Sequence, residues 1–219
     1  MFKEKIKVYG ENVMANPWEE IPLSDYEKHM KLGSVMQLQT LNEMMKGQFA
    51  AYPVSSIMIL GIAGGNGLEH IPRDKFKTIY GVDINNSYLQ TVIQRYPELN
   101  GHLECLCLNL IDETEKLPKA ELLVANLLVE YIGYDCFQKA VKQVQPKYVS
   151  CIIQINIDDG WVSDSPYIHV FDKLDEVHHQ VEEDLLIQAL EGIGYKKIAQ
   201  NEKALPNGKK LVQLDFMEM

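Results

Sequence analysis

SIMILGIAGGNGLEHIPRDKFKTIYGVD, residues 56–83, organises the rest of this chain. It begins with an uncharged apolar run, residues 57–60, which is typical of a strand buried on both faces. In the glycine-rich turn that follows, the lack of side chains lets a ligand lie close to the backbone, and we expect Leu68 to open a helix whose first amide groups face that ligand. A second apolar run ends at Asp83, whose carboxylate can accept hydrogen bonds from both hydroxyls of a ribose. The pattern predicts an adenosine-type ligand at the carboxyl ends of parallel strands.

The spacing of the glycines distinguishes between two classes of cofactor. The dinucleotide fingerprint needs glycines at its first, third and sixth positions. Counted from Gly61, the third position is Ala63 and the sixth is Asn66. Counted from Gly65, the sixth position is His70. Neither frame fits, which argues against a nicotinamide-dependent oxidoreductase.

The same turn resembles the first motif of class I S-adenosylmethionine-dependent methyltransferases, an acidic residue followed by glycines at alternate positions. Ala63, Gly65 and Gly67 match the alternate small positions, whereas Gly61 stands where the family usually has Asp or Glu. Asp83 follows at about the 20-residue distance that a ribose-binding acid requires. The alternative interpretation is a tight strand-to-helix turn that binds no ligand.

The resemblance implies S-adenosyl-L-methionine as cofactor, with S-adenosyl-L-homocysteine as product, and it indicates which residues bind it. Asn109, after a predicted strand at residues 102–108, would bond the exocyclic amine of adenine; an ordinary turn role for Asn109, with Asp112 as the contact, is the alternative. Asn126 ends the next predicted strand and matches the family's fourth motif in position. The complete expected set is Gly61, Ala63, Gly65, Asn66, Gly67, Asp83, Ile84, Asn109, Leu110 and Asn126.

Candidates for the substrate side come from three segments. In the resembling family an N-terminal helical segment often supplies part of the substrate wall, and Tyr26, His29, Met30 and Met36 are the candidates here. Glu130 and Tyr131 follow the strand that ends at Asn126 and could face the methyl acceptor. An exposed glutamate that favours the helix dipole is the alternative for Glu130.

A connection of unusual length, residues 156–175, contains Trp161, Tyr167 and Phe171 and suggests a binding loop. Within it, His169 is a candidate base or acceptor contact because its ordinary pKa is near neutral. An incidental surface histidine is the alternative.

Composition limits the classes of partner. The net charge of −10 opposes a broad phosphate-binding surface, so we expect no nucleic acid. No apolar run approaches the roughly 18 residues that cross a bilayer, and the charged start lacks the core of a signal peptide. We expect a cytoplasmic protein without membrane contact. His178 and His179 are adjacent and cannot form a two-ligand helical pair, so we expect no metal. The oligomeric state stays open.

We expect an α/β fold: a Rossmann-like, doubly wound, mostly parallel seven-stranded sheet with a C-terminal antiparallel hairpin strand. Residues 1–16 are expected to be irregular, and helices are expected to begin near the caps Ser24 and Ser34. Residues 1–50 would form an N-terminal helical cap and residues 51–219 the methyltransferase domain, within a single domain overall. The function expected is methyl transfer to a small-molecule acceptor, with a non-catalytic cofactor-binding module as the alternative.

Overall fold

The computed structural model describes residues 6–8, 16–72, 74–156 and 160–219. They form a single sheet in the order β1-β4-β3-β2-β5-β6-β8-β7. The strands are β1 (Ile6–Val8), β2 (Ser56–Leu60), β3 (Thr78–Asp83), β4 (Leu103–Cys107), β5 (Leu122–Asn126), β6 (Tyr148–Ile155), β7 (Tyr195–Ala204) and β8 (Lys210–Glu218). The α-helices are α1 (Leu23–Lys31), α2 (Gln37–Ala51), α3 (Asn86–Arg95), α4 (Val129–Val144) and α5 (Glu183–Glu191). The short 3-10 segments are η1 (Pro17–Glu19), η2 (Leu68–His70), η3 (Pro97–Leu99), η4 (Thr114–Lys116) and η5 (Ile168–Glu176).

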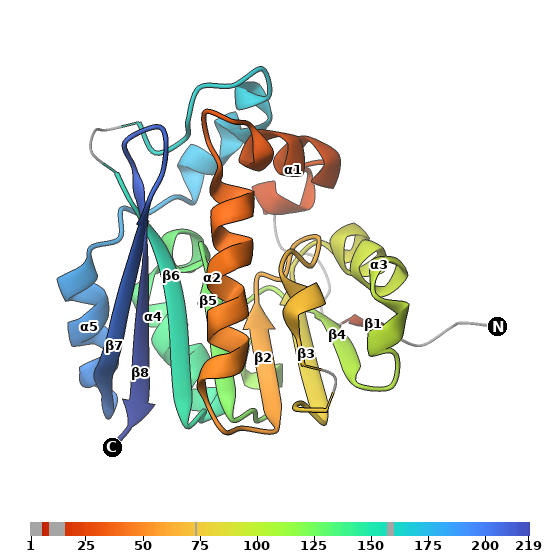
Figure 1. Ribbon diagram of the computed structural model, residues 1–219, viewed down its shortest axis with the longest axis vertical. Coiled ribbons are helices and arrows are strands. Elements are labelled where there is room, and N and C mark those ends of the chain that lie inside the picture. Colours follow the sequence, from red (N-terminus) through yellow and green to blue (C-terminus); the bar gives the residue numbers. More distant parts are fainter. Residues whose placement is uncertain (1–5, 9–15, 73, 157–159) are drawn as a thin grey trace.

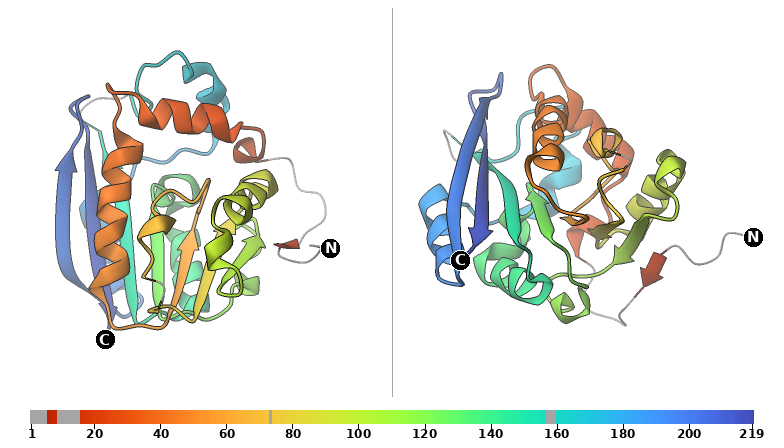
Figure 2. Two further views of the ribbon diagram at one scale, coloured as in Figure 1. Left: turned by 45° about the vertical axis from the view of Figure 1, so that its right-hand side comes forward. Right: turned by 60° about the horizontal axis from the view of Figure 1, so that its bottom comes forward.

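Helices cover both faces of the sheet, as predicted (Figure 1). α4 and α5 pack on one face against Met58 and Leu60, whereas α2 and α3 pack on the other against Ile57 and Ile59. The apolar run is therefore buried on both sides, because successive side chains of a strand point to opposite faces. α1 lies across the end of the sheet to which the parallel strands run (Figures 1 and 2).

The strand directions also agree with the prediction. β1 to β6 pair in parallel, while β8 pairs antiparallel with both β6 and β7. β2 to β8 are the seven strands expected, and β1 adds an eighth, an edge strand beside β4 in a segment expected to be irregular. A strand of three residues is too short to display the alternation that identifies strands in a sequence.

Three local expectations are wrong. Leu68 opens only a single 3-10 turn, η2, and Pro72 closes this region soon afterwards. α1 begins at Leu23 after Pro22, and α2 begins at Gln37 after Met36 in the left-handed conformation, so neither Ser24 nor Ser34 is the cap. Serine is a favourable cap but not an obligatory one, and tertiary packing outweighs its contribution of about 1 kcal/mol.

α2 is attached to the sheet by buried polar groups as well as by apolar packing. The Gln48 amide exchanges two hydrogen bonds with the Asn126 amide, at 3.0 and 2.9 Å, and donates to Ser150 Oγ at 2.8 Å. Ser150 in turn donates to Asp215, which also accepts from the Tyr52 hydroxyl at 2.8 Å. The helix position is thus fixed relative to β5, β6 and β8, because each buried group depends on the next.

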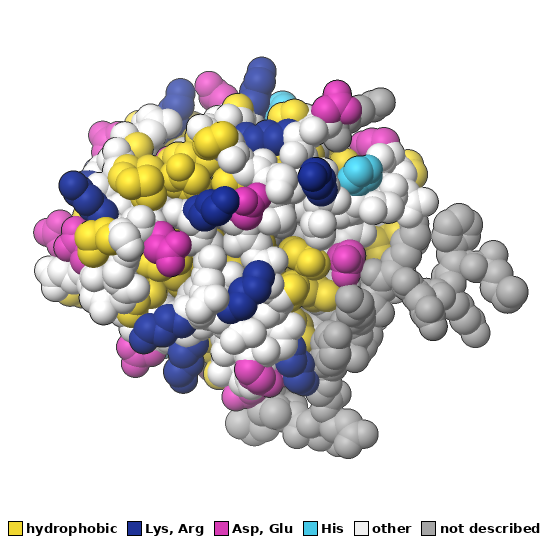
Figure 3. Space-filling model, turned by 90° about the horizontal axis from the view of Figure 1, so that it is seen from below, with side chains coloured by type: hydrophobic (Ala, Val, Ile, Leu, Met, Phe, Trp, Pro, Cys, Tyr) yellow, Lys and Arg dark blue, Asp and Glu magenta, His cyan; other side chains and the backbone are white. Residues whose placement is uncertain are grey.

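Surface charge is mixed where it is visible. On the face in Figure 3, lysine and arginine side chains alternate with aspartate and glutamate and do not gather into one basic surface. Among the described residues, the helices are too short or too polar to cross a membrane.

We predict that Gln48→Ala lowers the free energy of unfolding by about 2–4 kcal/mol, because Asn126 and Ser150 lose buried partners. Urea denaturation measures the change. The matched control is Gln188→Ala on the exposed side of α5, which should change stability by no more than about 0.5 kcal/mol. Equal effects of the two substitutions would contradict the role assigned to Gln48.

Candidate functional site

A pocket of about 680 Å³ lies at the carboxyl ends of β2, β3, β4 and β5, and we call it the strand-end pocket. Strand order reverses between β2 and β5, and ligands of open α/β sheets bind at such a switch point. The lining includes many residues that the sequence predicted for the cofactor: Gly61, Ala63, Asp83, Ile84, Asn109, Leu110 and Asn126.

The turn after β2 brings bare backbone to this pocket. Gly61 has φ +67° and Ala63 has φ +46°, conformations that L-residues with side chains rarely adopt. A Cβ at Gly61 would lie 3.1 Å from Leu128 Cδ1. An acidic side chain at this position would therefore be strained and crowded, which explains the glycine where the resembling family has an acid.

Asp83 ends β3 and contacts the same turn. One carboxylate oxygen accepts from Ala63 N at 2.8 Å and the other from Asn85 N at 2.9 Å. Burial nevertheless raises the pKa of Asp83 to about 6, against these two hydrogen bonds. Each oxygen keeps a second acceptor position, so the carboxylate can both hold the turn and bind two hydroxyls.

The second half of the glycine-rich turn packs against α2 and the residue after α3 instead of lining the strand-end pocket. A Cβ at Gly65 would lie 2.8 Å from Tyr96 Cε2, and one at Gly67 would lie 2.9 Å from Met45 Sδ. Asn66 donates to Leu38 O at 3.0 Å and lines a neighbouring hollow. The structure therefore sets Gly65, Asn66 and Gly67 against α2 and the residue after α3, outside the strand-end pocket.

Two asparagines reach the pocket with side chains that are already bonded. Asn109 accepts from Ile111 N at 3.0 Å and donates to Asp112 Oδ2 at 3.2 Å. Asp112 is exposed and does not line the pocket, whereas Asn109 lines it and also has the turn role of the alternative interpretation through its bond with Ile111 N. Asn126 is the partner of Gln48 described above.

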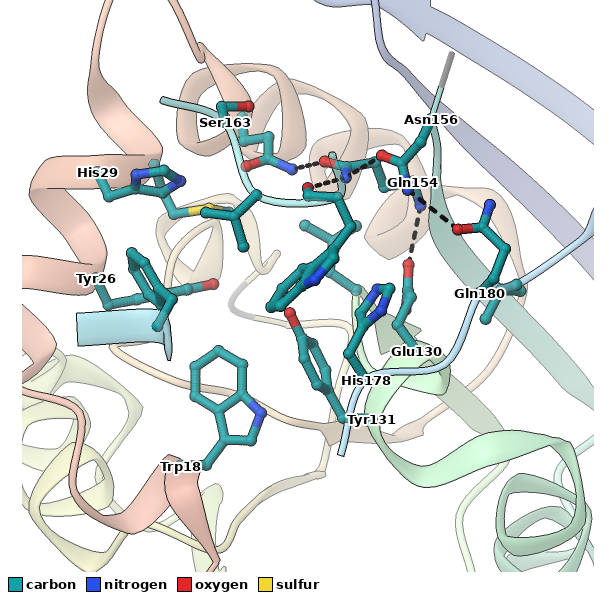
Figure 4. A pocket seen from close by; sticks show the side chains of 17 residues that line it. Trp18, Tyr26, His29, Glu130, Tyr131, Gln154, Asn156, Ser163, His178 and Gln180 are labelled. Atoms are coloured by element: carbon teal, nitrogen blue, oxygen red, sulfur yellow. Dashed lines mark hydrogen bonds between the residues drawn. The ribbon is translucent and has the colours of Figure 1, made fainter. Parts of the chain in front are cut away.

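A second pocket of about 630 Å³ adjoins the first, and we call it the aromatic pocket (Figure 4). The two pockets share Trp18, Tyr26, Leu127 and Tyr131 as a common wall. The other residues that line the aromatic pocket include His29, Met30, Gln37, Glu130, Gln154, Asn156, Trp161, Ser163, Phe171, His178 and Gln180.

The aromatic rings that line this pocket contact one another in a series that runs from η1 and α1 to the residues after β5. The centroids of Trp18 and Tyr131 lie 4.8 Å apart with planes at 85°, and Trp18 meets Tyr26 at 5.7 Å. Trp161 stacks on His178 at 4.0 Å with planes at 11°. Edge-to-face and stacked rings fix one another's orientation, so the wall is built before any ligand arrives.

Glu130 is the one carboxylate that lines the aromatic pocket, within the described residues. It is 5% exposed, which rules out the alternative of a solvated glutamate. Its Oε1 accepts from Gln154 N at 2.9 Å, whereas Oε2 has no partner among the described residues. Burial raises the pKa of Glu130 to about 7. A buried carboxylate with an unused oxygen is costly for folding, so it indicates a functional role.

The break in α4 explains how Glu130 and Tyr131 reach the pocket. α4 begins at Val129, three residues after the end of β5. Gly133, with φ 70° and ψ 168°, interrupts the helical geometry. Glu130 and Tyr131 thus sit on a separate first turn directly after β5. Burial and the nearby Glu130 raise the pKa of Tyr131, so its hydroxyl stays protonated and can donate.

Not every predicted substrate residue reaches the aromatic pocket. The His169 side chain is 87% exposed and lies 3.3 Å from Asp172, because η5 turns Phe171 and Leu174 inward instead. Met36 and Tyr167 also lie outside the lining.

Sequence reasoning missed Trp18 and Gln154. Gln154 lies on β6, where a polar residue in an apolar run was the available signal. Trp18 comes from η1, and no spacing in the sequence connects it to the site.

The site shows no arrangement for a metal: among the described residues, no group of three or more His, Cys, Asp or Glu could hold one.

Neither a protein-family model nor a curated protein sequence matches this chain. Among solved structures, the N-methyltransferase NodS from Bradyrhizobium japonicum, in complex with S-adenosyl-L-homocysteine, has a TM-score of 0.63 at 11% identity over 90% of this chain and 97% of its own. Geranyl diphosphate C-methyltransferase from Streptomyces coelicolor has a TM-score of 0.62 at 10% identity, over 83% and 76%. The [4+2]-cyclase SpnF has a TM-score of 0.63 at 8% identity, over 86% and 84%. The chain has the Rossmann-like fold of class I S-adenosylmethionine-dependent methyltransferases.

We predict that Glu130→Gln gains stability relative to the unmodified protein as the pH rises from 5 to 8. In the folded state the carboxyl keeps its proton up to about pH 7, whereas in the unfolded chain it ionises near 4.5. Because the folded state binds the proton more tightly, the stability of the unmodified protein falls as pH rises through this range. The variant has no carboxyl at this position and therefore does not lose this free energy of unfolding, which amounts to at most about 3 kcal/mol.

Urea denaturation at both pH values measures the gain, with Glu176→Gln in exposed η5 as the matched control. A difference in stability that does not change with pH would contradict the buried, protonated glutamate.

Proposed function

We propose that this protein is an S-adenosyl-L-methionine-dependent methyltransferase that acts on a small-molecule acceptor. The observation that carries the proposal is the pair of adjoining pockets with a common wall. A donor held in the strand-end pocket and an acceptor held in the aromatic pocket would meet at Trp18, Tyr26 and Tyr131. The two methyltransferases among the similar structures described above both contain S-adenosyl-L-homocysteine, which supports the choice of cofactor.

The residues of the strand-end pocket fit this cofactor. The backbone at Gly61 and Ala63 gives a ligand close access, since no side chain rises from Gly61 into the pocket. Asp83 has acceptor positions left for the two ribose hydroxyls. Ile84 and Leu110 provide apolar contacts, and Asn109 lies beside them at the end of β4. In this proposal, the side of the turn that faces away from the strand-end pocket is supported by Gly65, Asn66 and Gly67.

The bound cofactor supplies a methyl group that its sulfonium makes electrophilic. The protein has to align donor and acceptor at about 3 Å and to exclude water. Within residues 1–50, the segment from η1 to α1 acts as the cap in this scheme, because Trp18 and Tyr26 form the wall between the pockets and His29 and Met30 close the acceptor side. β1 and α2 belong to the sheet and its covering layer instead. Residues 51–219 provide the other seven strands and the cofactor site in this proposal.

A specific observation also favours a second candidate, a non-catalytic module that binds the cofactor. Gly61 lacks the acid with which the resembling family contacts the methionine amino group, and the fold also occurs in a cyclase. Fold alone does not determine chemistry.

We predict that S-adenosyl-L-methionine binds the unmodified protein and that Asp83→Ala weakens binding about 10- to 100-fold, because hydrogen bonds to a charged group are lost. Isothermal titration calorimetry measures the affinities. Asp172→Ala, which removes an exposed carboxylate that lines neither pocket, should bind as the unmodified protein does. Unchanged affinity in Asp83→Ala would refute the ribose contact.

A transfer experiment distinguishes the enzyme from the non-catalytic module. We predict that the protein, incubated with methyl-labelled cofactor and a cell metabolite extract, moves label onto at least one small molecule. The same mixture with heat-denatured protein is the control. Tight cofactor binding without any labelled product would support the module.

A further inference from the structure

Resting on the function proposed above, we infer that the acceptor is a small amine, bound as its ammonium ion against Glu130 inside the aromatic pocket. The unused Oε2 of Glu130 is the group that recognises the acceptor nitrogen. Three features of this pocket support the assignment: its charge balance, its ring surfaces and the position of Glu130 beside the common wall.

The charge balance of the aromatic pocket favours a cation. Its lining includes one carboxylate, Glu130, and neither lysine nor arginine among the described residues. Burial lowers the pKa of both His29 and His178, so both rings are neutral near pH 7. The ammonium of Lys209 acts on both histidines from outside the lining, where it donates to the carbonyls of Gly160 and Trp161. Within the lining, a ligand ammonium would therefore meet the carboxyl of Glu130 and no other charged side chain among the described residues.

The ring surfaces favour the same kind of ligand. Trp18, Tyr26, Tyr131 and Trp161 all line the pocket, in contact as a continuous series. Aromatic faces attract cations through their quadrupole, tryptophan most strongly, and more so where water is excluded. Anionic acceptors such as carboxylates or phosphates would be repelled by Glu130.

Glu130 is held in place by hydrogen bonds, while its buried Oε2 lacks a hydrogen-bond partner among the described residues. Gln154 N fixes Oε1, and the backbone carbonyl of Glu130 accepts from His179 N at 2.6 Å. Tyr131, the next residue, belongs to the wall between the two pockets. An ammonium bound at Oε2 would thus lie next to the region where the methyl donor is expected.

This placement supplies the proton transfer that an amine acceptor needs. The ammonium ion loses one proton to Glu130 Oε2, which frees the nitrogen lone pair. The nitrogen then attacks the methyl carbon: the N–C bond forms, the C–S bond breaks, and its electron pair goes to sulfur. The methylated ammonium carries away the positive charge, the thioether is neutral, and Glu130 returns its proton to water. A carboxyl with a pKa of about 7 suits this exchange near neutral pH.

Four other titratable groups near Glu130 have a raised pKa. Burial raises the pKa of each of them above its ordinary value, so they stay protonated near pH 7. These groups are Tyr26 on α1, Tyr131 and Tyr134 on α4, and Cys151 on β6.

Fluorescence tests the inference without depending on methyl transfer, because the two tryptophans of the chain, Trp18 and Trp161, both line the aromatic pocket. Phenethylamine should change the emission saturably, and phenethyl alcohol, which has the same ring without the ammonium, should bind about tenfold more weakly or worse. The affinity for phenethylamine should rise between pH 6 and pH 8 as Glu130 ionises.

In Glu130→Gln, the preference for phenethylamine over the alcohol and its pH dependence should both disappear, whereas Glu176→Gln should keep both. Thermal melting of the two variants establishes that they are folded. Equal binding of amine and alcohol by the unmodified protein, or an amine preference that survives Glu130→Gln, would overturn the inference.

Calorimetry with S-adenosyl-L-methionine on the same variants separates the two proposals. Binding of the cofactor without amine preference contradicts the inference and leaves the proposed function standing. Amine preference without cofactor binding contradicts the proposed function. Labelled transfer to phenethylamine that Glu130→Gln abolishes while cofactor affinity is unchanged supports both.

Discussion

The reversal of strand order between β2 and β5 is the constraint on which the site depends. β2 continues to β3 on one side and pairs with β5 on the other, so the loops that leave the two strands diverge. The strand-end pocket occupies the space between these loops. The aromatic pocket follows from it, because the chain after β5 turns immediately into the short first turn that carries Glu130 and Tyr131.

The glycines of the glycine-rich turn are needed for two different reasons, backbone conformation and packing. Gly61 provides a backbone angle that few other residues tolerate, at the point where the strand-end pocket needs access to the backbone. Gly65 and Gly67 leave room for Tyr96 and Met45 instead. α2, which Gln48 holds on the sheet, supplies Met45 to this contact. The departure from the family motif at Gly61 is thus a consequence of local geometry.

Burial gives the two carboxylates of the site their properties. Asp83 and Glu130 each accept backbone hydrogen bonds, and each has a raised pKa because desolvation outweighs those bonds. Asp83 faces the strand-end pocket and Glu130 faces the aromatic pocket. The cost of keeping these two carboxylates away from water connects the stability of the fold to the proposed ligand recognition in both pockets.

The sequence alone predicted the core sheet, its mostly parallel order and its antiparallel end, because alternation, apolar runs and turn residues are local signals. It failed for β1, for the helix expected at Leu68 and for the serine caps, where tertiary contacts outweigh weak local preferences. Among the residues predicted for the cofactor, those at strand ends line the strand-end pocket, since strand ends of a parallel sheet meet at one edge.

The sequence by itself determined a nucleotide-type turn followed by an acid, since the spacing of the glycines and their distance along the chain from the acid can be read from the order of the residues. Only the tertiary structure decided which side chains line the aromatic pocket. Trp18, Glu130 and Trp161 come from segments far apart in the sequence, and their meeting depends on the packing of the cap and the long connection around the end of β5. Burial likewise exists only in the folded chain, and burial makes Glu130 a proton acceptor near neutral pH while His169 remains a surface residue.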